Sequence, residues 1–560
     1  MYFLGFMLAL GLLIPDHFFP WPAFRHDVAV GVGFSVLIFG TAWRQISLPK
    51  AALFLVLLSF VPLLQAMAGE VVFWGDGWVS WLYILGAALT MISAANLMNE
   101  STLENPLHEL QPIVIALVIA AVISVGISLA QWFRLDVEFV SPPLDGIRFG
   151  ANLAQPNQLA ALLLIGLACG VFLFESKIVS AVPGCALALF LLFGLVMTQS
   201  RMAILVLIFA LTLYFGLRRQ ARLQLPVKAV LLFSGFFALA SLTWSSINSV
   251  LLLKVPVSML ERTTNDVRLN LWYSMVDALA RAPWFGYGWG QVSVAQQAVA
   301  LEYPPTYALF DSAHNIFLDI GLWAGLPVAL LFSIWLFSWV KEQIINCRDP
   351  LSWSILLAIG MIFCHAMVEY PLAYAYILLP VCFFMGALSR GELLIVGRPK
   401  SAMLFHFAFV GAKIIVLIAF AVISIEYLRF ESDWRRLRFS LANISLEREF
   451  DYSRPKFLTQ LRDYAEMAKI VPERGMPEKK LLWMKRVSER FGQPSILTKY
   501  AIAAALNGRP EAASQSLALI CKTQMPRVCR QVLKNWETIS SDSNYPEFKA
   551  VDIAALIAKN

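Results

Sequence analysis

The chain has 560 residues, of which 59% are hydrophobic and only 14% are charged. A soluble globular domain is nearer half apolar and a quarter charged, so the composition argues against an ordinary soluble protein and favours a membrane protein. The net charge of +7 does not indicate nucleic-acid binding. The segment 427–560 accounts for it with 23 Lys+Arg against 15 Asp+Glu, and these mixed charges are spread along helix-like stretches.

Apolar runs of about 17 to 25 residues, the length that a helix needs to cross a bilayer, recur along the first three-quarters of the chain. They predict thirteen spans, at about residues 2–14, 28–43, 51–68, 78–96, 112–133, 158–174, 178–198, 202–217, 229–250, 315–340, 351–369, 372–389 and 403–425. The first run has no basic stretch ahead of it and no small-residue cleavage site, so we expect a retained helix rather than a signal peptide.

Basic residues gather in loops on one side of these spans. They are Arg44, Lys50, Arg218, Arg219, Arg222, Lys228, Lys341, Arg348, Arg390, Arg398 and Lys400. The positive-inside rule therefore places the N-terminus inside. The loops 134–157 and 251–314, the turn 198–201 and the C-terminal tail then lie outside. The segment 96–111 is acidic where a basic loop is expected, but acidic residues carry little topological weight.

The sequence predicts an all-α polytopic membrane protein in three parts: N-terminal membrane helices (1–133), a membrane core with the long loop (134–426) and a soluble helical domain (427–560). In the tail we expect helices at 434–449, 455–470 and 476–491, then a hairpin at 499–519 that resembles a tetratricopeptide-like helical pair. An oxidising outer compartment would permit a disulfide between Cys521 and Cys529, although two unpaired core cysteines are the alternative. No metal-binding spacing occurs, and the lack of a Walker A loop argues against an ATP-driven pump, so we expect the chemistry to use organic side chains with no metal or other cofactor.

The first polar cluster runs from the loop 134–157 into the sixth span. It contains Arg148, Asn152, Gln155 and Asn157, with Pro156 at the mouth of the helix. Amides and a helix terminus can bind a polar headgroup. The simpler interpretation is a helix cap with Pro in its first turn.

A second polar cluster, Thr198–Arg201, breaks two apolar spans. A charged residue there is costly unless it is paired or functional, and Arg201 lies on the outer side, against the positive-inside bias. This favours function over simple snorkelling to the interface.

The long loop contains a predicted amphipathic helix, Glu261–Ala282, which carries Arg268 and Trp272. Arg268 is a candidate site residue, or it pairs with Asp266 or Asp277. The helix is followed by "PWFGYGWG", whose glycines predict tight turns with exposed backbone amides. Its aromatic residues suit an interface or a sugar-stacking surface.

His314 and Asn315 begin the tenth span, at the outer mouth of the membrane. Histidine titrates near neutral pH and is a natural general base, whereas a lone interfacial histidine is otherwise usually structural. Glu369 and Tyr370 end the eleventh span on the same side. Lys413 lies within the last span, and Asp319 and Glu369 are its candidate partners.

Together these residues suggest one reaction. Arg201 and Arg268 could bind a lipid pyrophosphate and stabilise it as a leaving group, while His314 takes the proton from an attacking hydroxyl. No metal is needed, because the arginines supply the positive charge.

The motifs resemble those of the Wzy/WaaL superfamily of O-antigen polymerases and ligases, and more narrowly the PglL-type bacterial protein O-oligosaccharyltransferases. "NLAQPNQLA" (152–160) resembles the segment that distinguishes the oligosaccharyltransferases. Arg268, Trp272, "PWFGYGWGQ", His314-Asn315 and "GLWAGLP" resemble the shared core. The likeness covers most of the chain from about residue 140, and the first five spans match only as generic membrane helices.

The resemblance implies an undecaprenyl-pyrophosphate-linked glycan as donor and a Ser or Thr hydroxyl of a pilin or other exported protein as acceptor. It implies a bacterial inner-membrane location with the active site in the periplasm. Arg201 and Arg268 would bind pyrophosphate, and His314 would activate the acceptor. Gln155 and Tyr370 would be further site residues, with Tyr374 an equally good match for the latter.

Two other functions stay open from the sequence. Ligation of the glycan to lipid A-core, or its polymerisation, would use the same donor and differ only in acceptor. A lipid-linked glycan transporter would instead show charged residues at many mid-span positions and inverted repeats of broken helices, whereas only Lys413 is deep in a span.

Overall fold

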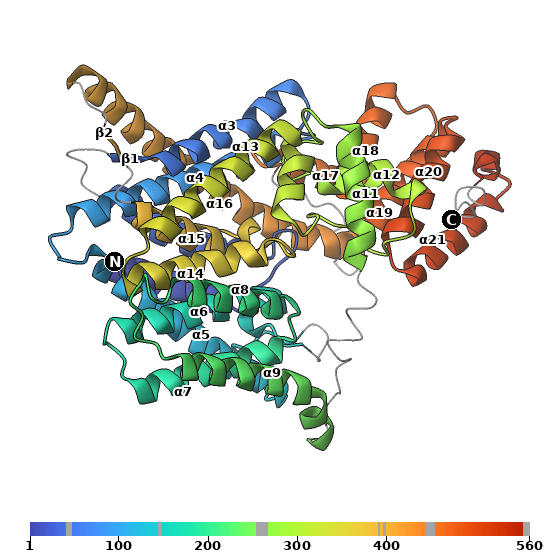
Figure 1. The fold of residues 1–560 in the computed structure, drawn as a ribbon. Helices are drawn as coiled ribbons and strands as arrows, with labels where there is room; N and C mark the ends of the chain where they lie inside the picture. Colours follow the sequence, from blue (N-terminus) through green and yellow to red (C-terminus); the bar gives the residue numbers. More distant parts are fainter. Residues whose placement is uncertain are drawn as a thin grey trace. The chain divides into compact units, whose positions relative to one another are not determined.

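A computed structural model describes residues 1–40, 47–143, 148–251, 253, 267–389, 393–395, 399–442 and 454–552 (Figure 1). Arg44, Arg390 and Arg398 of the basic loops lie outside these residues, as do Glu261–Asp266 of the predicted amphipathic helix and residues 443–449 of the first predicted tail helix.

The described chain is almost entirely helical. Its α-helices are α1 Tyr2–Leu13, α2 Phe24–Gly40, α3 Lys50–Ala68, α4 Trp74–Glu100, α5 Gln111–Trp132, α6 Pro156–Glu175, α7 Ala181–Thr198, α8 Met202–Leu217, α9 Val227–Val250, α11 Val267–Arg281, α12 Val292–Val299, α13 Ile316–Asn346, α14 Pro350–His365, α15 Ala375–Leu388, α16 Pro399–Leu441, α17 Thr459–Lys469, α18 Glu478–Phe491, α19 Pro494–Leu506, α20 Pro510–Thr523 and α21 Pro526–Ser540. Short 3₁₀ turns occupy Pro106–Leu110, Ala151–Leu153, Ala300–Glu302, Pro371–Ala373 and Pro546–Ala550. A small antiparallel pair that was not predicted joins β1 (Ser47–Pro49) to β2 (Leu393–Ile395).

Every predicted span coincides with a helix, but the count of thirteen membrane crossings stays a prediction. Eight helices in the described part of the chain are long and apolar enough to cross a membrane, and α1, α8, α14 and α15 are shorter apolar helices. The protein is thus a multi-pass helical membrane protein.

The chain forms two compact units that interleave along the sequence. The first comprises Met1–Leu58, Leu82–Asn265 and Ile334–Phe420, and the second comprises Ser59–Trp81, Asp266–Ser333 and Ala421–Asn560. The predicted division of the chain into the three parts 1–133, 134–426 and 427–560 stays a prediction.

In the first unit, α6 is the central helix. It packs against α5, α7 and α14, and α7 packs in turn against α9 (Figure 1). Seven consecutive residues of α6, Leu159 to Ile165, are buried, because the helix is apolar on all sides. The polar segment at the start of α6 is therefore held by a rigid, buried helix.

In the second unit, α11, α12 and the start of α13 share one core. Leu271, Met275 and Ala278 of α11 pack with Val292, Ala295 and Val299 of α12 and with Ala313 and Leu322. Helix α12 contacts α18, and α17 to α21 follow as a series of packed helices. Cys521 and Cys529 form a disulfide that joins α20 to α21.

The tail differs from the prediction at its start. The first part of the predicted separate helix at 434–449, as far as Leu441, is the continuation of α16. The sequence has no Gly or Pro between Gly411 and Leu441, so no residue there ends the helix. The predicted hairpin is α19 and α20, which turn at Gly508 (φ +74°). One such hairpin does not establish a tetratricopeptide fold.

Candidate functional site

Gln155 caps the start of the central helix. Its side-chain oxygen accepts hydrogen bonds from the backbone N–H of Asn157 (2.5 Å) and Gln158 (2.9 Å). Pro156 occupies the first helical position, where no intrahelical N–H is needed. The helix-cap interpretation of this segment is confirmed for Gln155, and the cap fixes the direction of the amide that follows.

Asn157 connects three segments that are far apart in the sequence. Its Oδ1 accepts from Arg148 Nη2 (2.9 Å) and from Ser200 Oγ (2.8 Å). Its Nδ2 donates to Glu369 Oε1 (2.6 Å). Glu369 is only 4% exposed, and its charge is connected to the Arg148 guanidinium through one amide. The predicted clusters at Arg148–Asn157, Thr198–Arg201 and Glu369 therefore meet in the first unit.

The turn between α7 and α8 has a constrained backbone. Gln199 adopts a left-handed conformation (φ +49°) and ends α7, while Thr198 accepts the N–H of Ser200 on its hydroxyl. The Thr198 carbonyl accepts from Arg148 Nε (3.1 Å). Arg201, half-buried, follows this turn directly, so its backbone position is set by the same network that holds Arg148.

Asn152 is bound on all sides by main-chain groups. Its Oδ1 accepts from the N–H of Ser141, and its Nδ2 donates to the carbonyls of Leu13 and Phe139. His17 shares a 2.7 Å hydrogen bond with the Asn152 carbonyl. This geometry suits a residue that positions the segment.

The N-terminal helices match the resembled family only as generic membrane helices, yet they make hydrogen bonds to the segment that begins α15. Asp27 accepts from the Tyr83 hydroxyl (2.5 Å) and from the N–H of Ala375 at the start of α15 (2.8 Å). The rings of Tyr370 and Tyr374 stack just ahead of that helix, with centroids 5.9 Å apart. Tyr370 and Tyr374 therefore form one stacked aromatic pair. Asp27 was not predicted, because its partners Tyr83 and Ala375 are distant from it in the sequence.

In the second unit, the backbone around His314 is held by a carboxylate. Asp319, 2% exposed, accepts from Ser312 Oγ and from the N–H of Ala313, both at 2.6 Å. Ser312 Oγ in turn accepts the N–H of His314 (2.9 Å). His314 adopts a left-handed conformation (φ +57°), which is uncommon for a residue other than glycine. The next residue, Asn315, caps α13 by accepting from the N–H groups of Phe317 and Leu318.

The role of Asp319 was missed from the sequence, where it was considered only as a partner for Lys413. The spacing does contain a signal, since Asp319 lies one helical turn after Asn315 and its carboxylate can reach back to the segment before the helix. Glu369, the other candidate partner of Lys413, accepts from Asn157. The ammonium of Lys413 lies 5.0 Å from the Phe409 ring centroid.

Helix α11 brings Arg268 to the same unit as His314. It covers Val267–Arg281, and Trp272 donates from Nε1 to the Ala313 carbonyl (2.7 Å), which ties the helix to the residue before His314. Asp277, one alternative partner for Arg268, pairs with Arg281 (2.7 Å). Asp266, the other alternative, lies outside the described residues.

The glycine-rich segment after α11 packs on a break in α13. Gly286, Gly288 and Gly290 have positive φ, as the predicted tight turns require. Gly325 (φ +83°) interrupts α13, and a Cβ there would lie 2.2 Å from the Trp284 carbonyl oxygen. Trp284 and Phe285 are mostly exposed, so they are the aromatic rings available to an interface or a sugar.

Among the described residues, no group of three or more His, Cys, Asp or Glu side chains could hold a metal ion. The first unit offers Arg201 beside a network of amides, and the second unit offers His314 on a fixed backbone with Arg268 at the start of α11. These groups can transfer a proton and bind an anion.

Comparison with known proteins gives two family matches and two close relatives. The O-antigen ligase family matches residues 186–333, which contain Arg201, Arg268 and His314. The C-terminal family of virulence-factor membrane-bound polymerases matches residues 353–521, which contain Glu369 and Tyr370. No solved structure matches the chain significantly.

Both relatives are from Acinetobacter baylyi (strain ATCC 33305 / BD413 / ADP1). The general O-oligosaccharyltransferase is 27% identical over 523 residues, which cover 92% of this chain and 90% of the relative. The ComP-specific O-oligosaccharyltransferase is 26% identical over 507 residues, which cover 88% and 89%. The two family matches and the two relatives together support a glycosyltransferase of the PglL type within the Wzy/WaaL superfamily.

Proposed function

We propose that the protein transfers an oligosaccharide as one unit from undecaprenyl pyrophosphate to Ser or Thr hydroxyls of a pilin or another exported protein. The observation that carries this proposal is the similarity to two O-oligosaccharyltransferases over about nine-tenths of both chains. The match includes the tail and the segment 152–160, the two features that we expect to separate protein acceptors from lipid acceptors.

In the proposed reaction the acceptor oxygen attacks the anomeric carbon of the first sugar, and the bond from that carbon to the pyrophosphate oxygen breaks. His314 accepts the hydroxyl proton, and lipid pyrophosphate leaves with the electron pair. An unactivated hydroxyl is a poor nucleophile, so a positioned base is needed. The hold of Ser312 and Asp319 on the backbone of His314 supports this role, because a base must be held in a fixed direction.

Arg201 and Arg268 stabilise the charge that develops on the pyrophosphate. Guanidinium groups bind phosphate in a bidentate way and stay charged at every working pH. Two contacts support this role. The Ser200 N–H donates to the Thr198 hydroxyl and fixes the Thr198–Arg201 turn, and Trp272 anchors α11.

The network of Arg148, Asn157 and Glu369 holds the polar mouth of α6 in place for the donor. Gln155, Asn152 and Asn315 act through their caps and main-chain contacts, and Tyr370 offers an aromatic face for a sugar ring. The active site and the tail face the periplasm from the bacterial inner membrane.

The acceptor is tested by competition. Purified full-length protein is reconstituted with lipid-linked glycan, a pilin and lipid A-core together, and both products are quantified. We expect glycan on the pilin and none on the lipid core. Transfer to the lipid core alone would identify a ligase, and growth of the lipid-linked chain without an acceptor would identify a polymerase.

A further inference from the structure

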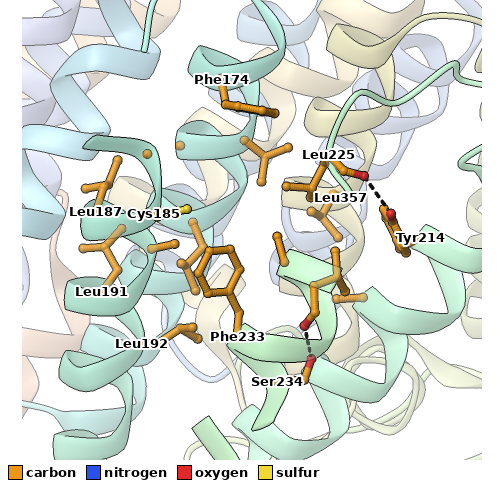
Figure 2. A pocket seen from close by; sticks show the side chains of 18 of the residues that line it. Phe174, Cys185, Leu187, Leu191, Leu192, Tyr214, Leu225, Phe233, Ser234 and Leu357 are labelled. Atoms are coloured by element: carbon orange, nitrogen blue, oxygen red, sulfur yellow. Dashed lines mark hydrogen bonds between the residues drawn. The ribbon is translucent and has the colours of Figure 1, made fainter. Parts of the chain in front are cut away.

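The first unit contains an apolar cavity away from the polar mouth of α6. It has a volume of about 230 Å³ and lies among α6, α7, α8, α9 and α14. Its lining includes Phe174, Cys185, Leu187, Leu191, Phe233 and Leu357 (Figure 2). An apolar cavity of roughly 150 Å³ takes up benzene, so this one has room for a segment of hydrocarbon chain.

The polar side chains that line this cavity donate hydrogen bonds to main-chain carbonyls of the protein. The Tyr214 hydroxyl donates to the Leu225 carbonyl (2.7 Å), as Figure 2 shows. Ser234 Oγ donates to the Val230 carbonyl (2.9 Å). Trp353, which also lines the cavity, donates from Nε1 to the Leu213 carbonyl (3.5 Å), so with these three donors used the interior favours an occupant without polar groups.

One end of the cavity is closed by a basic loop. Leu225 and Pro226 line the cavity, and buried Glu175 accepts the N–H groups of Gln224 and Leu225, which folds the loop over the ends of α6 and α8. The Glu175 carboxylate therefore has main-chain N–H groups as its hydrogen-bond partners.

The loop and its neighbours carry positive charge. Lys177, Arg219, Arg222 and Lys228 are exposed, and segments 176–190 and 217–230 contain no acidic residue. The Arg218 guanidinium lies 5.8 Å from the ring centroid of Tyr214, which lines the cavity. A cationic rim therefore stands beside an apolar interior.

We propose that this cavity binds one anionic phospholipid, with an acyl chain among α6, α7 and α9 and the phosphate on the basic rim at Arg218 and Arg222. Basic pockets between membrane helices favour anionic headgroups, each Lys or Arg contributing to affinity, and the apolar interior matches a chain. The site is separate from the transfer chemistry and does not depend on which side of the membrane the loop faces.

Cys185 lines the cavity and is exposed, so its alkylation reports occupancy. Delipidated full-length protein in neutral detergent is treated with N-ethylmaleimide, and the Cys185 peptide is quantified by mass spectrometry. Dioleoylphosphatidylglycerol should slow the reaction several-fold, and dioleoylphosphatidylcholine at the same concentration should leave the rate unchanged. Equal protection by both lipids, or protection only by a polyprenyl phosphate, would overturn the proposal.

Two pairs of variants separate the rim from the interior. The double variant Arg218→Gln/Arg222→Gln should raise the phosphatidylglycerol concentration for half-protection roughly tenfold or more. The matched variant Lys341→Gln/Arg348→Gln removes the same charge from another loop and should not change it.

For the interior, Ala188→Phe fills the cavity and should abolish retention of phosphatidylglycerol in native mass spectrometry. Ala238→Phe, at an exposed position of α9 outside the cavity, should retain it. Equal effects of both members of either pair would contradict a specific site.

Discussion

His314 has a backbone conformation that its surroundings must impose. A left-handed residue other than glycine carries a cost that persists only where neighbouring contacts over-determine it, and such residues cluster at functional sites. Here the contacts are the Ser312 hydroxyl on the His314 N–H and the Asp319 carboxylate on Ser312 and Ala313. The backbone conformation at His314, from which the imidazole projects, thus depends on Asp319.

We predict that Asp319→Asn lowers kcat by roughly tenfold or more and leaves KM for the lipid-linked donor within about twofold. An asparagine oxygen is a weaker acceptor than a carboxylate, and hydrogen bonds to charged groups contribute about 1.5–3 kcal/mol. Steady-state transfer to an acceptor protein measures both constants. Asp311→Asn makes the same charge change at an exposed position nearby and should keep both constants. A loss confined to KM would contradict the positioning role.

Asn157 is the residue on which the first unit's polar network depends. Asn157→Ala removes the donor to Glu369 and the acceptor for Arg148 and Ser200. We predict a loss of about 1–3 kcal/mol in the free energy of unfolding, because buried polar groups lose their partners, together with a clear loss of transfer.

The control for Asn157 is Gln158→Met at the next position. The Gln158 side-chain oxygen is buried and accepts no hydrogen bond from the described residues. Both variants are compared by thermal unfolding and by transfer rate. Equal behaviour of the two would show that the network has no special role.

At the scale of elements, α13 is two helical segments joined at Gly325. Its positive φ and the approach of Trp284 leave no room for a side chain. The N–H of Tyr287 donates to the Leu322 carbonyl, and the N–H of Leu326 donates to the Pro283 carbonyl. The break therefore anchors the aromatic segment at 283–290 beside the helix that starts after His314.

We expect Gly325→Ala to destabilise the protein by roughly 1–3 kcal/mol, because it combines a strained φ with a steric clash. Gly411→Ala in α16 is the matched control, since nothing lies within 4 Å of its added Cβ. That change should be neutral or slightly stabilising. Thermal unfolding in detergent compares them, and an unchanged melting temperature for Gly325→Ala would be contrary to this account.

Elements were largely predictable from the sequence where hydropathy alone decides. Each apolar run became a helix, even where it contains a proline, because a long apolar segment has no other way to satisfy its backbone in a membrane. The break at Gly325 was not foreseen, since glycine within an apolar run gives no sign of its φ. The β1–β2 pair was not foreseen either, because three-residue strands carry no periodic signal.

The residues of the polar network at the start of α6 were selected from the sequence, but their contacts with one another were not. Polar groups at span ends stand out because they are costly in a membrane, which is why Arg148, Asn157 and Glu369 were selected. That Asn157 joins the other two depends on the packing of α6 against α14. Asp27 binds the hydroxyl of Tyr83 and the N–H of Ala375, and such distant partners can be identified only in three dimensions.

At the scale of the whole molecule, the second unit joins the tail to segments from much earlier in the chain. Arg490 of α18 forms a two-pronged pair with Asp76 (2.9 and 3.1 Å), with both side chains largely buried. The hydroxyl of Thr459 accepts the N–H of Gly75 (3.0 Å), and Ser293 donates to the Arg490 carbonyl. The tail helices are thus packed as part of one unit.

We predict that Arg490→Gln destabilises this unit by about 2–4 kcal/mol, because Asp76 would keep a largely buried charge without its partner. Faster limited proteolysis of the tail would report the change. Lys485→Gln breaks only an exposed pair with Glu489 and should have a negligible effect. Equal proteolysis rates for the two variants would exclude a structural role for the buried pair.

The most direct test of the proposed activity is the intact mass of an acceptor pilin after incubation with lipid-linked glycan and purified full-length protein. The native protein should raise the pilin mass by one glycan. His314→Ala should lower the rate by about 10²-fold or more, the usual contribution of a general base, while His108→Ala should retain the native rate. A pilin whose mass never changes with the native protein, or full activity in His314→Ala, would contradict the account.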